Sequence, residues 1–308
     1  MFDHWYALDL GGHSIRLIDL NKDNAWQSRS VIAWNQKEVQ ALGVDAFPYI
    51  YQDQRKISVK YPINHDQILS PVAPLIKQGL EQLGAGNNIF QPHGLVLIPS
   101  EAHMERLESW RQQINEAGIQ RLDFVKVSDC LKTQQPTLCI HAGHTYTEMG
   151  IFTSTRCINR KTVFYAGKQI DEAIQTVVAT KMRCLISEED ATALKEAASA
   201  SLAARKQEML ICNAKNQHNQ FVQIQIRPSQ LWPCIQNVAG QITLWAKQCL
   251  ENLDIETKQL VARNGVLLSG GLALCFGIKE TLEQELNMPV YLSENPQWEL
   301  VQQLKEWQ

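Results

Sequence analysis

The sequence predicts an α/β protein built from two similar halves around a cleft. The first observation is a β-rich hairpin at residues 6–20, whose two apolar runs flank the turn Gly11-Gly12-His13-Ser14. The second is a similar hairpin at residues 138–152, and aligning Asp9 with His141 offsets the two by 132 residues. The third is a strand–helix–strand succession, which is typical of a parallel sheet. The long offset argues against a solenoid.

The expected elements of the first half follow the hairpin in chain order. Ser100 is a suitable helix N-cap and Gly118 a suitable stop. The elements are a polar segment at 21–60, a helix at 66–83, a buried strand at 95–98, a helix at 101–117 and a strand at 123–127.

The second half repeats this order after its own hairpin. The predicted elements are helices from 167 through 178 and at 188–206, an alternating strand at 221–226, a long helix at 229–253, a strand at 265–269 that enters a glycine turn, a helix ending near 286, a strand at 289–292 and a short terminal helix after Pro296.

The segments near the two ends of the chain carry apolar side chains, which are expected to be buried against the protein, a membrane or a partner. Phe2, Trp5 and Tyr6 resemble an interfacial membrane anchor, but aromatic residues also favour strands, and we expect Trp5 and Tyr6 to enter the first strand. The terminal segment 298–307 has apolar residues on one helical face. We expect it to dock within the molecule, with docking on a partner as the alternative.

Composition narrows the class of protein. Lys plus Arg is 29 and Asp plus Glu is 32, so the net charge of −3 argues against sequence-independent nucleic-acid binding. The eight cysteines form no C-x-x-C pair, which argues against a zinc knuckle or a redox dithiol. No apolar run approaches the roughly 18 residues of a membrane-spanning helix, and the first residues lack the basic start of a signal peptide. We expect a reduced, cytoplasmic protein with no nucleic-acid partner.

The glycine turns are the candidate chemical features. Gly11 and Gly12 allow backbone N–H groups to approach phosphate oxygens closely. Asp9, at the end of a strand, could hold Mg²⁺ through water. The pair Gly270-Gly271 offers a flat backbone wall and a helix N-terminus to a nucleotide. Each feature taken alone is weak evidence, because a lone glycine turn is more often a tight corner that binds nothing.

Taken in order, these motifs resemble those of the bacterial actin-like MreB family. The resembling segments are Leu8-Asp9-Leu10-Gly11, residues 30–33, 61–63 and 97–100, the second hairpin with Gly143, Thr147 and Glu148, the run 166–174, and residues 266–273 and 288–296. The resemblance implies an actin-like bilobed fold, with two duplicated halves and mixed sheets around a nucleotide cleft. It places lobe I at 1–137, with a small subdomain at about 21–60. Lobe II would span 138–308, with a small subdomain at about 185–228.

The resemblance also implies ligands and partners. It implies that the chain binds ATP with Mg²⁺ and self-associates into protofilaments. It also implies a role in cell shape, with envelope proteins at the inner membrane as partners. Peripheral attachment to that membrane is therefore an alternative to a purely cytoplasmic location. Asp9 would serve the magnesium ion. The nucleotide- and phosphate-binding positions carried over are Asp9, Gly11, Gly12, His13, Ser14, Gly143, Thr145, Thr147, Lys195, Gly270 and Gly271.

The second phosphate motif departs from the family pattern. His141 stands where the family has an aspartate that helps to position magnesium, and imidazole supplies no fixed negative charge. His144 and Thr145 interrupt the glycine run, and Tyr146 replaces a threonine. The bulkier side chains would crowd the terminal phosphate.

Other departures concern hydrolysis and the nucleoside. The family's catalytic glutamate has no clear counterpart, and Asp129 is the nearest carboxylate. Leu272 replaces the third glycine of the adenosine motif, and Thr192 stands where a glutamate would pair with Lys195. We therefore expect a degenerate site with weak or no ATPase activity, in which ATP is a structural ligand.

Three histidines suggest a second kind of site. In the actin architecture the two hairpin turns face each other, which would bring His13, His141 and His144 together. The spacing His141-x-x-His144 is compatible with metal ligands. An anion bound by cationic imidazoles is an alternative, and polar turns lined by solvent are the simplest explanation.

The functional prediction is an MreB-like cytoskeletal or scaffold protein in cell shape or envelope organisation. One alternative is a slow ATPase that forms nucleotide-dependent filaments. Another is a monomeric membrane adaptor like the actin-like protein of type IV pili, which resembles this chain in Ser14-Ile15-Arg16-Leu17.

Overall fold

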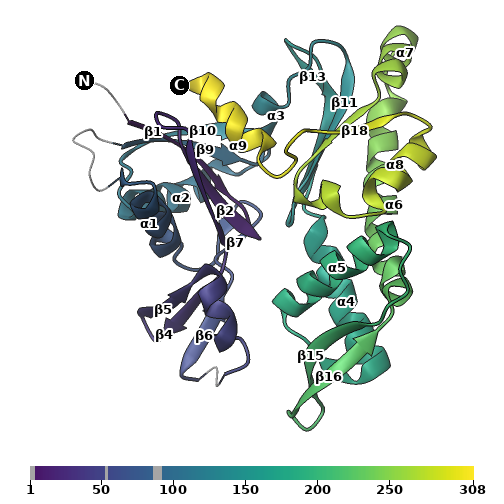
Figure 1. The fold of residues 1–308 in the computed structure, drawn as a ribbon. Coiled ribbons are helices and arrows are strands. Elements are labelled where there is room, and N and C mark those ends of the chain that lie inside the picture. The colour runs from purple at the N-terminus through teal and green to yellow at the C-terminus, as the bar shows by residue number, and fades with distance from the viewer. Residues whose placement is uncertain (1–3, 53–54, 86–91) are drawn as a thin grey trace. The chain divides into compact units, whose positions relative to one another are not determined.

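The computed structural model describes residues 4–52, 55–85 and 92–308. Contacts divide the chain into two compact units (Figure 1). The first unit is Met1–Lys132 together with Trp298–Gln308, and the second is Thr133–Gln297. The last segment of the chain therefore packs with the first unit.

The first unit is built on a mixed five-stranded sheet in the order β10-β9-β1-β2-β3. The central strand β1 pairs antiparallel with β2 and parallel with β9, so the predicted hairpin and buried strand are both confirmed. The strands are β1 (His4–Leu10), β2 (Ser14–Asp19), β3 (Asn24–Arg29), β9 (Pro92–Ile98) and β10 (Arg121–Lys126).

Two helices, α1 (Ala73–Gln82) and α2 (Met104–Glu116), pack in the same core as this sheet, where Tyr6 and Trp110 are almost fully buried. The prediction of a helix from residue 66 was wrong, because a short hairpin of β7 (Ile63–Asn64) and β8 (Gln67–Ile68) comes first. Pro71 restricts the residue before it to extended conformations, which delays the helix.

The segment expected as a small subdomain contains a separate antiparallel sheet in the order β5-β4-β6. Its elements are β4 (Ile32–Asn35), β5 (Glu38–Leu42), the 3₁₀ helix η1 (Gly43–Tyr49) and β6 (Ile57–Lys60). After β10 the chain makes one short helix, α3 (Val127–Cys130).

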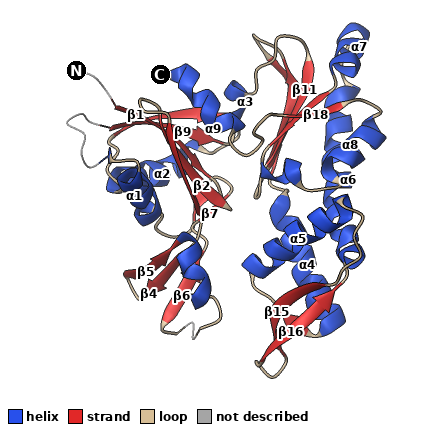
Figure 2. Cartoon of the chain, viewed as in Figure 1, coloured by secondary structure: helices blue, strands red, loops and turns tan. Residues whose placement is uncertain are grey.

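The second unit repeats the mixed sheet, in the order β13-β12-β11-β17-β18 (Figure 2). Its second hairpin is confirmed by the antiparallel pairing of β11 and β12, and β11 pairs parallel with β17. The strands are β11 (Thr137–Ala142), β12 (Thr147–Phe152), β13 (Cys157–Val163), β17 (Val266–Ser269) and β18 (Val290–Leu292).

Helices and a small sheet complete the second unit. The predicted helix at 229–253 is confirmed as the long helix α6, which is followed by a separate helix, α7. The helices are α4 (Gly167–Met182), α5 (Glu188–Ala203), α6 (Pro228–Glu251), α7 (Ile255–Asn264) and α8 (Ile278–Leu286), and the small sheet is β14 (Cys184–Leu185), β15 (Leu210–Asn216) and β16 (Phe221–Ile226). Within the described residues, no helix is long and apolar enough to cross a membrane.

The C-terminal segment docks within the molecule, as predicted. It forms α9 (Glu299–Gln303) and the 3₁₀ helix η4 (Leu304–Trp307), and contacts β1, β2 and α3 of the first unit. Leu300, Val301 and Leu304 are buried. The Lys132 ammonium lies 5.3 Å from the centre of the Trp307 ring.

The N-terminal aromatic residues also follow the prediction. Trp5 and Tyr6 lie in β1, where Tyr6 is fully buried and Trp5 stacks on His93 with ring centres 3.8 Å apart. Phe2 lies outside the described residues.

Candidate functional site

The two hairpins are built alike around their turns. In the first, Asp9 faces Arg16 across the strands, and in the second His141 faces Glu148. The same backbone bond closes each turn: Gly11 N donates to Ser14 O at 3.1 Å, and Gly143 N donates to Tyr146 O at 2.9 Å. Each of these residues of the first hairpin has its counterpart in the second hairpin 132 positions later, so the predicted alignment of the two hairpins is confirmed.

Close approach of the backbone explains the glycines at the starts of both turns. A Cβ atom on Gly11 would lie 2.8 Å from Ser14 O, and one on Gly143 would lie 3.1 Å from Tyr146 O. Turn closure therefore favours glycine at both positions, whether or not a phosphate binds there.

The carboxylate of Asp9 is held inside the first unit. Arg16 Nη1 donates a hydrogen bond to Asp9 Oδ2 at 3.0 Å, and Arg16 Nε donates to Gln27 Oε1 at 3.2 Å. The guanidinium carbon lies 5.6 Å from the centre of the Trp298 ring. Burial raises the pKa of Asp9, and the charge of Arg16 and its hydrogen bond oppose that rise.

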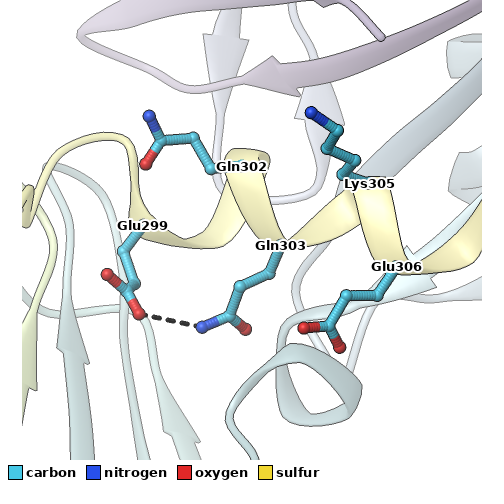
Figure 3. A pocket seen from close by; sticks show the side chains of 5 residues that line it. All are labelled: Glu299, Gln302, Gln303, Lys305 and Glu306. Carbon is cyan, nitrogen blue, oxygen red and sulfur yellow. Dashed lines mark hydrogen bonds between the residues drawn. The ribbon is translucent and has the colours of Figure 1, made fainter.

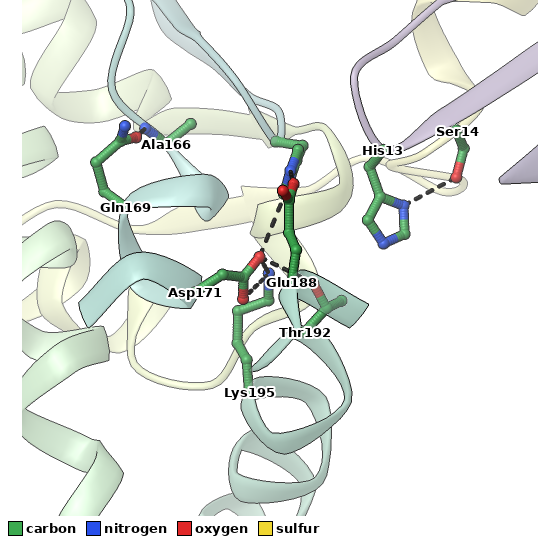
Figure 4. Close-up of polar contacts among 9 residues, drawn as sticks. His13, Ser14, Ala166, Gln169, Asp171, Glu188, Thr192 and Lys195 are labelled. Carbon is green, nitrogen blue, oxygen red and sulfur yellow. Dashed lines mark hydrogen bonds and ion pairs between the residues drawn. The ribbon is translucent and has the colours of Figure 1, made fainter. Parts of the chain in front are cut away.

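The rest of the first turn is ordered by short polar contacts (Figure 4). His13 Nδ1 and Ser14 Oγ are 2.9 Å apart, and the Ser14 side chain is buried. Ser30 N donates to His13 O at 2.9 Å. Asp129, the predicted substitute for a catalytic acid, lies half-buried on α3 of the same unit.

The second turn uses its side chains for structure. His141 Nδ1 lies 3.2 Å from Ser269 Oγ at the end of β17, and Glu148 is fully buried. Thr147 Oγ1 donates to Tyr165 O at 2.8 Å, and Thr145 is also buried. The hydroxyl of Thr147 is therefore already engaged by the backbone.

The carbonyls of the second turn accept hydrogen bonds from the start of α4. Gly167 N donates to Gly143 O at 3.3 Å, and Lys168 N donates to His144 O at 2.7 Å. Ala166 N donates to the side-chain oxygen Oε1 of Gln169 at 2.7 Å. N–H groups at a helix N-terminus would otherwise suit an anion, but here the protein itself satisfies three of them.

A buried cluster of charges lies beside this turn (Figure 4). Asp171 on α4 accepts hydrogen bonds from Lys195 Nζ and Thr192 Oγ1 of α5, each at 2.9 Å. His144 Nδ1 lies 3.8 Å from Asp171 Oδ2, and His144 Nε2 lies 3.6 Å from Glu188 Oε1. We name these five residues the Asp171 cluster.

Burial lowers the pKa of His144, although the carboxylates of Glu188 and Asp171 favour its protonated form. The charge of Lys195 adds to the lowering. Burial therefore favours the neutral form of the His144 ring.

Asp171 and Glu188 were not among the predicted site residues. In the sequence, Asp171 is the first of two adjacent acids in the segment 166–174, and Glu188 is one of three acidic residues that begin α5. Nothing in the sequence linked them to His144, because the cluster joins three separate elements.

The glycine pair after β17 differs from the prediction. A 3₁₀ turn, η3 (Gly271–Leu274), follows it, and α8 begins only at Ile278, so the pair does not open directly into a helix. Gly270 has φ +89°, and a Cβ there would lie 2.2 Å from Ala142 O. At Gly271 the nearest atom, in Gln297, is 3.9 Å away. Gly270 is thus required by strand packing, whereas a Cβ at Gly271 would make only an ordinary van der Waals contact with Gln297.

No group of three or more His, Cys, Asp and Glu side chains suited to a metal ion occurs within residues 4–52, 55–85 and 92–308. His13 belongs to the first unit and His141 and His144 to the second. The proposed convergence of the three histidines stays a prediction.

An open polar hollow lies along the C-terminal segment in the first unit (Figure 3). Two of the side chains that line it are joined by a hydrogen bond, in which Gln303 Nε2 donates to Glu299 Oε1 at 2.8 Å. Its lining residues are Glu299, Gln302, Gln303, Lys305 and Glu306, none of which was a predicted site residue.

Solved structures share this fold. The crystal structure of MreB5 of Spiroplasma citri bound to ADP aligns with a TM-score of 0.87 at 17% identity, covering 99% of this chain and 96% of that one. The MamK double helical filament aligns with a TM-score of 0.77 at 15% identity, covering 99% and 98%. The actin-like fold that the motifs implied is confirmed.

Sequence comparisons give the family. The chain is 21% identical to the cell shape-determining protein Mbl of Bacillus subtilis (strain 168), over 96% of this chain and 93% of that protein. It is 20% identical to the cell shape-determining protein MreB of Escherichia coli (strain K12), over 96% and 90%. The MreB/Mbl protein family model matches residues 4–306. The chain therefore belongs to the MreB/Mbl family.

Proposed function

We propose that this chain is a scaffold in cell shape or envelope organisation that self-associates into protofilaments and binds ATP without efficient hydrolysis. The observation that carries the proposal is the family match over residues 4–306, since it spans both units. The relatives named as cell shape-determining proteins support the role, and the double helical filament of MamK supports self-association.

Nucleotide binding is supported by the first turn and by the structural neighbours. MreB5 of Spiroplasma citri, which shares this fold, has been solved with ADP and with AMPPNP. In this chain, Gly11 N donates to Ser14 O, so the N–H groups of the turn that follow it would hold phosphate oxygens. Among the described residues, Asp9 is bonded only by Arg16, at Oδ2, so Oδ1 would accept from a magnesium-bound water. Magnesium would supply charge neutralisation on the phosphates.

Weak hydrolysis is supported by the second turn. The side chain at position 141 is an imidazole that contacts Ser269, and it offers magnesium no carboxylate. Asp129 is the only carboxylate that we propose for positioning the hydrolytic water. Asp9 is the residue on which binding of ATP with Mg²⁺ would depend most.

The test is equilibrium binding of a fluorescent ATP analogue with and without Mg²⁺, followed by phosphate release and a pelleting assay for filaments. We expect saturable, magnesium-dependent binding that Asp9→Asn weakens about tenfold, little phosphate release, and sedimentable polymer. Asp45→Asn, at an exposed position on η1, is the matched control.

Each other outcome changes the proposal in a defined way. Saturable phosphate release that Asp9→Asn abolishes would make the chain a slow ATPase. Absence of binding at high protein concentration would remove ATP from the proposal. A strictly monomeric protein that captures a membrane-protein peptide would favour the adaptor alternative.

A further inference from the structure

Lys195 is a buried cation whose charge is already balanced. Its residue is 8% exposed and Asp171 is 1% exposed. The ammonium lies 2.9 Å from both carboxylate oxygens of Asp171, and Thr192 Oγ1 donates to one of them. Two buried opposite charges in this geometry stabilise each other, and removing one leaves the other uncompensated.

This pair is connected to the second turn. Asp171 Oδ2 lies 3.8 Å from His144 Nδ1. The helix that carries Asp171, α4, also contacts the turn, because Gly167 N and Lys168 N donate hydrogen bonds to carbonyl oxygens of the turn. Glu188 on α5 faces the other ring nitrogen of His144. The turn, α4 and α5 therefore meet at one buried point, and Asp171 contacts both other elements.

We propose that Lys195 is the internal cation of the Asp171 cluster, not a ligand of the nucleotide, and that Asp171 and Lys195 together fasten the turn 142–147 to α4 and α5. The family resemblance would place Lys195 on the nucleotide. The contacts of Lys195 support a positioning role instead. Only the effect on nucleotide affinity rests on the proposed function.

The first measurement is a double-mutant cycle in thermal stability, with Lys195→Met, Asp171→Asn and the double variant. We expect Lys195→Met to lower Tm by about 5–10 °C, because it leaves the buried carboxylate of Asp171 without a counter-charge. The double variant removes both charges and should recover at least half of that loss. Lys181→Met, at an exposed position in the last turn of α4, is the control and should leave Tm unchanged. Simple additivity of the two losses would overturn the proposal.

The second measurement is amide hydrogen exchange of the peptides that contain residues 142–147 and 166–168. We expect both Lys195→Met and the double variant to speed exchange at Gly167 and Lys168, whose N–H groups donate to the turn, because neither variant retains the ion pair. Unchanged exchange in Lys195→Met would contradict a fastening role. If Lys195→Met does not fold, Asp171→Asn and the double variant still give both readouts.

The third measurement separates positioning from direct contact. If Lys195 positions the turn through Asp171, the Kd for the fluorescent ATP analogue should rise in Lys195→Met and also in Asp171→Asn, which keeps the ammonium but removes the ion pair. If Lys195 contacts the nucleotide, Lys195→Met should lose affinity about tenfold, whereas Asp171→Asn, which retains the ammonium, should bind nearly as tightly as the wild type. That result would overturn the proposal. Absence of binding by the wild type would instead count against the proposed function, and the first two measurements would still decide the role of Lys195.

Discussion

Arg16 lies directly opposite Asp9 across the first hairpin and donates a hydrogen bond to its carboxylate at 3.0 Å. At the equivalent positions of the second hairpin, a base and an acid exchange places, with His141 on the first strand and Glu148 on the second. The duplicated backbone thus carries its acid and its base in opposite order in the two turns, which explains why a single motif rule cannot describe both.

The raised pKa of Asp9 predicts a specific pH dependence. The folded state binds this proton more tightly than the unfolded state, whose Asp pKa is near 3.8, so Asp9 lowers stability as pH rises from 3.8 through its raised folded value. Asp9→Asn should remove that part of the pH profile. Chemical denaturation of both proteins across acidic pH measures it, and parallel profiles would contradict it.

His144 should contribute in the opposite sense. Its pKa in the folded state lies below the ordinary value of 6.5, so the stability that it contributes is present above pH 6.5 and is lost as pH falls toward the lowered value. We expect His144→Gln to destabilise the protein at pH 7.5 and to do so less at pH 5.5. The groups that face the ring are Asp171, Glu188 and Lys195. An equal cost at both pH values would show that His144 does not titrate in this range.

Gly270→Ala should be strongly destabilising, by at least about 2 kcal/mol, because the position has φ +89° and a Cβ would overlap Ala142 O. Gly271→Ala is a neighbouring control, since its Cβ would meet only Gln297 at 3.9 Å. Urea denaturation of both variants gives the two values. Similar losses would indicate that close packing against β11 does not govern Gly270.

Leu304→Ala should cost about 2–5 kcal/mol, because this fully buried side chain joins the C-terminal segment to the first unit. Gln302→Ala, at an exposed position on the same segment, should change stability by less than about 0.5 kcal/mol. Denaturant titration of each variant is the measurement. A small loss for Leu304→Ala would mean that the segment detaches without disturbing the first unit.

Local patterns were sufficient for the main strands. The apolar run at 95–98 and both hairpins appear where they were predicted, because strand pairs closed by short turns are encoded in adjacent residues. The helix expected from residue 66 begins at Ala73 because Pro71 and a short hairpin precede it. Strand β15 was not predicted, since only its partner β16 has a clear alternating pattern.

The candidate site was harder to predict than the fold. Glycines at 11, 143 and 270 were identified correctly as turn residues, because backbone closure leaves a local signature. The Asp171 cluster has no such local signature in the sequence. His144, Asp171 and Lys195 come from three separate elements, and only tertiary packing brings them together. Lys195 was predicted to face a nucleotide because the resemblance gave its role without its neighbours.

Both ends of the chain belong to one unit, since residues 298–308 pack with the first, and this has a consequence for biosynthesis and for labelling. The second unit is continuous in sequence, so the ribosome releases all of it before the first unit has received Leu300, Val301 and Leu304. The first unit to emerge is therefore the last to be completed. Fluorophores at the two termini would both report on this unit, and a reporter for the second must be inserted internally, for example in the exposed turn at 217–220 between β15 and β16.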